Sequence, residues 1–304
     1  MAPHDNLSMT TLILGGRGQL AAALSEMLAD EATAIGRDRF DLRSDDPARL
    51  AEHAPSRVIN CAAYNAVDAA EQDAETAAAI NHHGVERLAR WCDASGVPLL
   101  HVSTDYVFSG GADGQMTPPP DGWTEAARPQ PRGVYASTKY AGEQAALDAG
   151  ATVVRTCGLY GRGRGGVNVA NRGGNFVETM LRLSESHDEV RVVSDQTCTP
   201  TACPDLAGWI VALLASGQTG LFHATSAGRC TWAELAGELF RIARRDTRVV
   251  SITTADYGAP APRPVNSVLS CDRLDAVLAG QDASPRRHWR DALAAYVATR
   301  EPAG

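Results

Sequence analysis

Lysine is almost absent from this chain of 304 residues. Lys and Arg together number 28, and Lys139 is the single lysine among them. Long apolar runs are absent too, since no stretch approaches the roughly 18 to 20 apolar residues of a membrane-spanning helix. The first residues lack the charged start and apolar stretch of a secretion signal. We therefore expect a cytoplasmic protein that neither enters a membrane nor is exported.

Excess positive charge and regularly spaced cysteines are also missing. The net charge is −8 and the pI is about 5.5, which argues against nucleic acid or an anionic membrane as the main partner. The seven cysteines are odd in number and scattered, and their closest pair, Cys198 and Cys203, has no second pair nearby. We expect reduced thiols rather than a disulfide framework or a zinc site.

Segments of strand and helix character alternate along the chain, which predicts an α/β fold. The predicted strands are 11–14, 32–35, 57–63, 99–103, 152–156, 190–193 and 220–224, and the predicted helices are 19–28, 47–53, 75–94, 135–148, 175–184, 205–215 and 231–244. The strands are apolar throughout, as in a sheet buried on both faces. We expect a doubly wound, Rossmann-like parallel sheet over residues 1–156, with returning segments near 196–224. Residues 157–195 and 225–304 would form a smaller, mixed α/β C-terminal lobe that binds substrate.

A glycine turn joins the first strand to the first helix, with the spacing Gly15-x-x-Gly18-x-x-Ala21. Glycine lets the backbone approach a pyrophosphate closely, and the phosphates then lie at the positive end of the helix. Glycine turns also end strands for structural reasons alone, but a turn at the first βα junction favours a dinucleotide site.

The second predicted strand ends at the place where such a fold holds the adenosine ribose. Arg37 there is suited to the 2′-phosphate of NADPH, whereas Asp38 keeps NADH possible, and Asp41 and Leu42 follow. Charged residues in a loop need no ligand to explain them. The sequence favours NADPH over NADH and leaves the choice open.

The lone lysine lies four residues after Tyr135. Only seven of the 304 positions lie four after a tyrosine, and this spacing puts both side chains on one face of a helix. A neighbouring ammonium is expected to lower the pKa of the phenol, which makes Tyr135 a candidate proton donor to a carbonyl that receives hydride. The compact ammonium suits a tight site that a guanidinium does not fit. The alternative is an exposed helix lysine without a function.

The fourth predicted strand ends in Ser103-Thr104-Asp105. Ligands of open parallel sheets bind outside the carboxyl ends of the strands, so we expect these side chains in the cleft, with Thr104 bonded to a substrate carbonyl. Ordinary turn chemistry at a strand end is the alternative. Two glycine-rich segments, 110–133 and 158–174, lack periodicity, and the second carries Arg162, Arg164 and Arg172. It is either a loop that binds an anionic substrate or a surface insertion.

Taken together, these motifs resemble the extended short-chain dehydrogenases and, within them, the dTDP-4-dehydrorhamnose reductases. The resemblance covers nearly the whole chain. Its most specific parts are the runs Ser103-Thr-Asp-Tyr-Val-Phe108, Tyr135-x-x-x-Lys139-x-x-Gly-Glu143, Asp195-Gln196 and Arg263-Pro-x-Asn-Ser267. It implies that NADPH or NADH delivers hydride to the 4-keto group of a nucleotide-linked 6-deoxyhexose, most simply dTDP-4-dehydro-L-rhamnose.

The resemblance also implies a set of site residues. The catalytic residues would be Thr104, Tyr135 and Lys139, with Asn81 supporting the lysine. The cofactor would contact Gly15, Arg17, Gly18, Gln19, Leu20, Arg37, Asp41, Leu42, Ala62, Ala63, Tyr64, Tyr135 and Lys139. The substrate would contact Asn65, Val67, Thr104, Asp105, Asn175, Phe176 and Arg263.

The chain departs from this family in two places. Cys157-Gly158 stands where studied members have a tryptophan over the substrate nucleotide, so the base and the sugar stay open. Some members form a dimer through a divalent ion held by carboxylates, but Ala23 occupies the ligand position, so we predict no metal site and either a monomer or a homodimer.

Two other functions remain as alternatives. One is another nucleotide-sugar epimerase or ketoreductase, whereas a dehydratase is disfavoured because Tyr106 follows Thr104-Asp105 in place of a second carboxylate. The other is a non-catalytic NADP-binding subunit, like the regulatory partner of methionine adenosyltransferase. Substitution of Lys139 would separate an enzyme from such a subunit.

Overall fold

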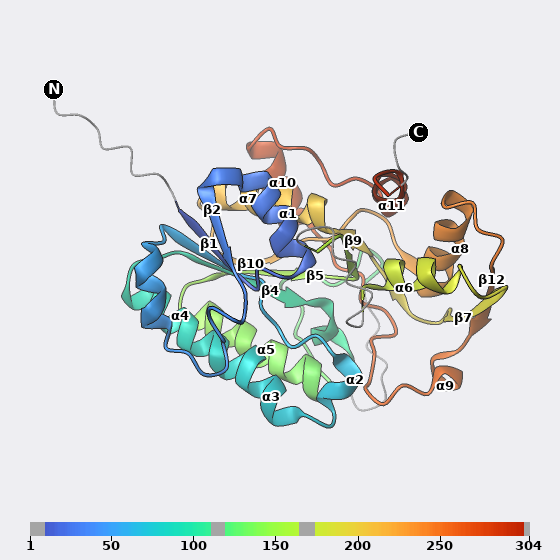
Figure 1. Cartoon of the computed structure of the whole chain (residues 1–304), viewed down its shortest axis with the longest axis horizontal. Coiled ribbons are helices and arrows are strands. Elements are labelled where there is room, and N and C mark those ends of the chain that lie inside the picture. Colours follow the sequence, from blue (N-terminus) through green and yellow to red (C-terminus); the bar gives the residue numbers. More distant parts are fainter. Residues whose placement is uncertain (1–9, 111–118, 164–173, 301–304) are drawn as a thin grey trace.

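The computed structural model describes residues 10–110, 119–163 and 174–300, and its centre is a six-stranded parallel sheet (Figure 1). The strands lie in the order β10-β5-β4-β3-β1-β2, and every neighbouring pair is parallel. Their bounds are β1 Thr11–Leu14, β2 Ala32–Ile35, β3 Arg57–Asn60, β4 Leu99–Thr104, β5 Thr152–Thr156 and β10 Gly220–His223. The chain builds outward from β1 in both directions, so the predicted doubly wound sheet is confirmed.

Helices cover both faces of this sheet (Figure 1). On one face lie α1 (Gln19–Leu28), α7 (Cys203–Ser216) and α10 (Asp272–Gly280), and on the other lie α3 (Ala74–Ala78), α4 (Val85–Ala94) and α5 (Gly133–Asp148). Successive residues of a strand point to opposite faces of the sheet. Ile13 packs with α1 and α7, whereas Leu12 packs with α4 and α5. Burial of the sheet on both faces explains why its strands are apolar throughout.

Two predicted elements differ most from the structure, whereas the bounds of several others shift by one or two residues. β3 ends at Asn60 instead of residue 63, where the Asn60 side chain accepts a bond from the backbone N–H of Ala62 at 3.0 Å and turns the chain out of the sheet. The predicted helix 75–94 is interrupted by a π-helical segment, η3 (Ala79–Gly84). Gly84 lies against the backbone of Leu42, where a Cβ atom would come within 2.3 Å of the Leu42 carbonyl oxygen.

A second apolar core lies beside the sheet. It is built by α6 (Phe176–Leu183), β7 (Glu189–Val193), α8 (Trp232–Ile242), β12 (Arg248–Ile252) and α11 (Trp289–Ala298). β7 and β12 pair in parallel, and Trp289 of α11 is fully buried among the helices. This is the part of the chain in which we expected a smaller, mixed lobe.

The remaining elements are short. They are η1 (Ala29–Glu31), η2 (Pro47–His53), α2 (Val67–Ala70), η4 (Asp105–Phe108), β6 (Leu159–Tyr160), β8 (Thr197–Cys198), β9 (Thr201–Ala202), β11 (Cys230–Thr231) and α9 (Thr254–Tyr257). β6 pairs with β9 and β8 with β11. In the part of the chain that the structure describes, no helix has the length and apolar character to cross a membrane.

Candidate active site

A pocket of about 580 Å³ opens at the carboxyl ends of the strands. It lies at the point where the strand order reverses, because β1 and β3 are neighbours there and the loops after them diverge. Its walls come from the start of α1, the loop after β3, the ends of β4 and β5, and α5. The lining residues are Gly18, Gln19, Leu20, Ala21, Cys61, Ala63, Asn65, Ala66, Val102, Ser103, Thr104, Asp105, Tyr106, Tyr135, Lys139, Thr156, Cys157, Gly158, Leu159, Gly174 and Asn175.

The glycine turn forms one end of this pocket. Gly15 has a φ of +81°, and a Cβ atom there would lie 2.8 Å from the backbone nitrogen of Ala62. Gly18 begins α1 without a side-chain cap, and the first turn of this helix holds no acidic residue. The N–H groups at the positive end of α1 therefore remain available at the pocket wall, as a pyrophosphate requires.

The region after β2 is rich in paired charges. Arg17 bonds Asp38 at 3.0 Å, so this carboxylate has a guanidinium partner, and both side chains are more than half exposed. Asp41 is held by Arg43, and this hydrogen bond lowers the pKa of the Asp41 carboxyl. Arg37 is exposed and forms no ion pair with any residue that the structure describes. This arrangement offers cationic groups where the ribose of a dinucleotide is expected.

The loop after β3 is held by buried amides. The Asn81 side chain accepts a bond from the N–H of Tyr64 at 2.8 Å and donates to the Tyr64 carbonyl at 3.1 Å and to the Thr138 hydroxyl at 3.4 Å. Asn81 thus connects η3 to the loop and to α5. The implied contact between Asn81 and Lys139 is not among these bonds, so Asn81 supports the neighbouring turn of α5 and not the lysine directly.

Thr104 and Tyr135 meet at the pocket floor. Thr104 ends β4, and its hydroxyl caps η4 by accepting the N–H of Tyr106 at 3.2 Å. Tyr135 is buried and its ring packs edge-on against Tyr106, with ring centroids 5.3 Å apart. Burial raises the pKa of Tyr135 to about 12, and the hydrogen bond with Thr104 opposes this rise. The expectation of a lowered phenol pKa is therefore wrong for this structure, because burial and the nearby Asp105 and Cys157 raise the pKa more than the Thr104 hydrogen bond lowers it.

Lys139 lies one helical turn beyond Tyr135 and is buried. Its ammonium donates to the carbonyl of Val102 at 2.7 Å. Burial lowers the pKa of Lys139 to about 8, and the carboxylate of Glu143 opposes this effect. A lysine whose pKa lies this near neutrality is typical of a functional site.

Asp105 lies beneath the pocket on the other side of Thr104. Burial raises the pKa of its carboxyl, and hydrogen bonds with Cys157, Ser267 and Thr104 act in the opposite direction. The Thr104 hydroxyl donates to this carboxyl at 3.2 Å. Asp105 thereby orients the hydroxyl of Thr104 and connects β4 to the loop that holds Ser267.

A second pocket, of about 280 Å³, shares Tyr106 and Gly174 with the first. Phe176 and Trp232 stand at its wall with ring centroids 4.8 Å apart, and Arg191 and Arg263 line it as well. Arg263 is bound to Asp68 through two bonds, of 3.0 and 2.7 Å. The two connected pockets thus combine polar groups at the sheet with aromatic and cationic groups at the second core.

The structure separates the expected site residues into three groups. Those that line the larger pocket are Gly18, Gln19, Leu20, Ala63, Asn65, Thr104, Asp105, Tyr135, Lys139 and Asn175, and those that line the smaller one are Phe176 and Arg263. Gly15, Arg17, Arg37, Asp41, Leu42, Ala62, Tyr64 and Val67 line neither. Leu42 is buried in the core with α4, so its side chain cannot contact a ligand in either pocket. Arg164 and Arg172 lie outside the described residues.

Sequence reasoning missed Trp232, which lies 74 positions beyond Gly158 although the two are in contact. A Cβ atom on Gly158 would lie 3.4 Å from the Trp232 indole. No local motif marks this residue, since it simply begins α8 after the Thr231 cap. Tyr106 belongs to the motif 103–108, but nothing in that motif predicts that its side chain lines both pockets.

A glycine turn at the switch point of a parallel sheet, with a buried Tyr-x-x-x-Lys pair and a threonine at the next strand end, defines a nicotinamide-dependent reductase of the short-chain dehydrogenase class. Comparisons with known proteins identify the family. Residues 9–301 match the RmlD substrate binding domain family, and the chain belongs to it. It is an NAD(P)H-dependent oxidoreductase of this family.

Three relatives illustrate the similarity. A dTDP-4-dehydrorhamnose reductase of Streptomyces griseus is 41% identical over 298 residues, which cover 93% of this chain and 91% of the relative. A probable dTDP-4,6-dihydroxy-2-methyloxan-3-one 4-ketoreductase of Streptomyces antibioticus is also 41% identical, over 94% of this chain and 93% of that protein. The solved structure of a dTDP-4-dehydrorhamnose reductase from Bacillus anthracis in complex with NADP has a TM-score of 0.84 and 31% identity, and covers 96% of this chain and 99% of that one.

Proposed function

We propose that this chain reduces the 4-keto group of a dTDP-linked 4-dehydro-6-deoxyhexose, with dTDP-4-dehydrorhamnose as the substrate and dTDP-L-rhamnose as the product. The observation that carries the proposal is the meeting of Thr104, Tyr135 and Lys139 in one pocket, with the uncapped start of α1 in the same wall. The names of both relatives at 41% identity supply the dTDP nucleotide, and the name of the relative from Streptomyces griseus supplies the sugar. We further propose a cytoplasmic enzyme that is a monomer or a homodimer.

The residues present fit a nicotinamide dinucleotide. The turn at Gly15 and Gly18 and the free N–H groups of α1 suit a pyrophosphate, and Arg17 and Arg37 suit the 2′-phosphate of NADPH. When bound, NADPH supplies the hydride. Arg37 has no ion-pair partner among the described residues, which leaves a guanidinium for that 2′-phosphate beside the Arg17–Asp38 pair. We therefore propose NADPH as the preferred cofactor.

The chain's own residues supply the proton and orient the ketone. A phenol with a pKa near 12 is protonated at neutral pH, so Tyr135 is ready to donate a proton to the carbonyl oxygen. Thr104 places a second hydroxyl beside Tyr135, and this hydroxyl would turn from the Asp105 carboxyl to donate to the carbonyl oxygen of the substrate. The Lys139 ammonium, held on Val102, makes the site electropositive and stabilises the phenolate that forms.

The pH dependence of kcat/KM should reflect the protonation state of Lys139. With a pKa near 8, the lysine is protonated below that pH and loses its charge above it, whereas Tyr135 stays protonated to about pH 12. We expect kcat/KM to be level near pH 7 and to fall about tenfold per pH unit above the pKa of Lys139. Steady-state kinetics with NADPH over this range measure it. A plateau that extends to pH 10 would rule out a role for the ammonium.

The smaller pocket is proposed to hold the nucleotide of the substrate. Phe176 and Trp232 offer aromatic faces to a base, and Arg191 and Arg263 offer positive charge to a diphosphate. Trp232 packs on Gly158 from another element, and so supplies the indole that Cys157-Gly158 lacks. The second core, built by α6, β7, α8, β12 and α11, is in this proposal the substrate lobe, whereas α10, within the expected range 225–304, covers the sheet instead.

Replacing Trp232 with alanine should raise the KM for the dTDP-sugar about tenfold, because base stacking on an aromatic ring is lost. The KM for NADPH and the value of kcat should stay within about twofold, since the indole lines the smaller pocket and not the larger. Trp91→Ala on α4 is the matched control, because Trp91 lines neither pocket. A fall in kcat with an unchanged KM would contradict this placement of the nucleotide.

The function itself is tested by NADPH consumption with enzymatically prepared dTDP-4-dehydrorhamnose, beside NADH and beside dTDP-4-keto sugars of other stereochemistry. Rapid consumption with the rhamnose precursor supports the proposal. Faster turnover of another sugar favours the second candidate, a 4-ketoreductase like the relative from Streptomyces antibioticus. Cofactor binding without turnover of any sugar would instead favour a non-catalytic NADP-binding subunit.

A further inference from the structure

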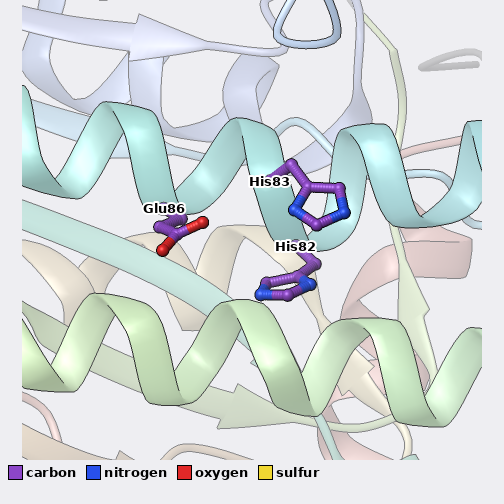
Figure 2. Close-up of side chains that lie close together, drawn as sticks. All are labelled: His82, His83 and Glu86. Atoms are coloured by element: carbon purple, nitrogen blue, oxygen red, sulfur yellow. The ribbon is translucent and has the colours of Figure 1, made fainter.

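Two histidines and a glutamate gather on the outer side of the helix that follows Asn81. His82, His83 and Glu86 project toward one another from η3 and the first turn of α4 (Figure 2). Each contributes one nitrogen or oxygen atom to a set whose members all lie within 4.8 Å of one another. The cluster is distinct from both pockets, none of whose lining residues belongs to it.

His82 and His83 are successive residues of the π-helical segment. In a regular α-helix, neighbouring side chains diverge by about 100° and do not face each other. The imidazole rings of His82 and His83 nevertheless lie at a centroid distance of 4.3 Å and an interplanar angle of 31°. Glu86 follows one turn later, so its carboxylate reaches the same face. Inserted π-helical turns are frequently found at functional sites.

We propose that His82, His83 and Glu86 bind a divalent transition-metal ion such as Zn²⁺ or Ni²⁺, with water in the remaining positions. Two imidazoles with one carboxylate suit these ions, whereas Mg²⁺ and Ca²⁺ prefer oxygen ligands throughout. Three protein ligands from one helical face leave the coordination shell open to solvent. The inference departs from the expectation of no metal site and does not depend on the proposed enzymatic activity.

The side chains are free to close around an ion. Two ligand atoms bound to one such ion lie about 3 to 3.5 Å apart, so the cluster needs a contraction of its present separations. His83 is exposed and the other two side chains are half-buried, which leaves their rotamers free to adjust. Glu86 has one competitor, because Arg90 donates to its carboxylate at 2.6 Å. The Arg90 side chain is 74% exposed, and such surface pairs contribute little.

Because the cluster adjoins the buried Asn81, a bound ion should stabilise the folded protein. Asn81, the residue before His82, is buried, and its amide holds the backbone of Tyr64 and the hydroxyl of Thr138. An ion on His82 and His83 would fix the outer side of the same π-helical turn. Binding to the folded state alone stabilises it, so the ion should raise the midpoint of thermal unfolding by about 2 to 4 °C at a tenfold excess over Kd.

Isothermal titration of the tag-free protein with Zn²⁺ and with Ni²⁺ tests the proposal, and Mg²⁺ serves as the comparison ion. We expect saturable binding of one ion per chain. His83→Gln and Glu86→Gln should each weaken it at least about tenfold, as expected for the loss of one ligand. Arg90→Ala should tighten it severalfold, because it frees the carboxylate and removes a positive charge. His187→Gln, an exposed histidine on another element, is the control and should change nothing.

His83 and Arg90 are exposed, so their variants are expected to fold, and circular dichroism verifies this. The effect of Arg90→Ala separates this site from adventitious binding at other histidines and at the thiols, which that substitution leaves unchanged. Absence of saturable binding, or binding that survives both His83→Gln and Glu86→Gln, would overturn the proposal.

Discussion

Replacing Tyr135 with phenylalanine is expected to lower kcat by about 10²- to 10⁴-fold, the usual contribution of a positioned proton donor. The phenol hydroxyl is the group that lies with Thr104 at the floor of the pocket, and its pKa near 12 keeps the proton available at neutral pH. The ring is retained in the variant, so its edge-on contact with Tyr106 persists. NADPH should therefore bind with nearly unchanged affinity, which fluorescence titration measures.

Tyr140→Phe is the matched control for this variant, because Tyr140 belongs to the same helix, α5, but lines neither pocket. It should retain nearly full activity. Turnover of the Tyr135→Phe enzyme within about threefold of the parent would leave no role for the phenol as an acid. The comparison also addresses the alternative of a non-catalytic subunit, whose effect on a partner protein should not depend on this hydroxyl.

Replacing Arg155 with methionine should destabilise the protein by about 3 to 5 kcal/mol, the usual cost of breaking a buried ion pair. The Arg155 and Glu143 side chains are 1% and 0% exposed, and the guanidinium bonds the carboxylate at 2.9 and 2.5 Å. Ser103 also donates to this carboxylate at 2.7 Å. Without Arg155, Glu143 keeps a buried charge with too few partners. Urea denaturation followed by circular dichroism measures the change in the free energy of unfolding.

Arg241→Ala is the control for Arg155→Met, because Arg241 also pairs with a glutamate, Glu238, but is 71% exposed. Its loss should leave the free energy of unfolding nearly unchanged. If Arg155→Met costs as little as Arg241→Ala, the buried pair is not a stabilising element of the fold. The double change Arg155→Met with Glu143→Leu should recover part of the loss, since no uncompensated charge then remains.

Much of the central sheet could be predicted from local patterns. The strands of the sheet are short apolar runs followed by turns, and their predicted positions agree with the structure to within a few residues. The placement of Tyr135 and Lys139 in one pocket was predictable because their spacing puts both on one helical face. The π-helical turn at 79–84 was not, because it depends on close contacts of Gly84 with Leu42 and of Asn81 with Gly142, which are distant in sequence.

The protonation of the catalytic pair shows the limit of spacing as a guide. The Tyr-x-x-x-Lys spacing predicted a lowered phenol pKa, yet burial raises it to about 12, and the ammonium bonds Val102. Spacing gives the direction of side chains along a helix but says nothing of the solvent they lose or of the carbonyl that a neighbouring strand presents. The burial of Tyr135 and the hydrogen bond from Lys139 to Val102 both depend on the packing of α5 against β4.

By itself, the sequence determined the class of fold and the family, and it supplied the proposed catalytic residues, because hydrophobic periodicity, turn chemistry and motif spacing are local properties. The tertiary structure alone decided which residues meet across long separations. It placed Trp232 on Gly158, joined Arg155 to Glu143 beneath the pocket, and brought His82 and His83 side by side. The physical reason is that burial, ion pairing and ligand geometry depend on distances between elements, and those distances exist only once the sheet and its helices have packed.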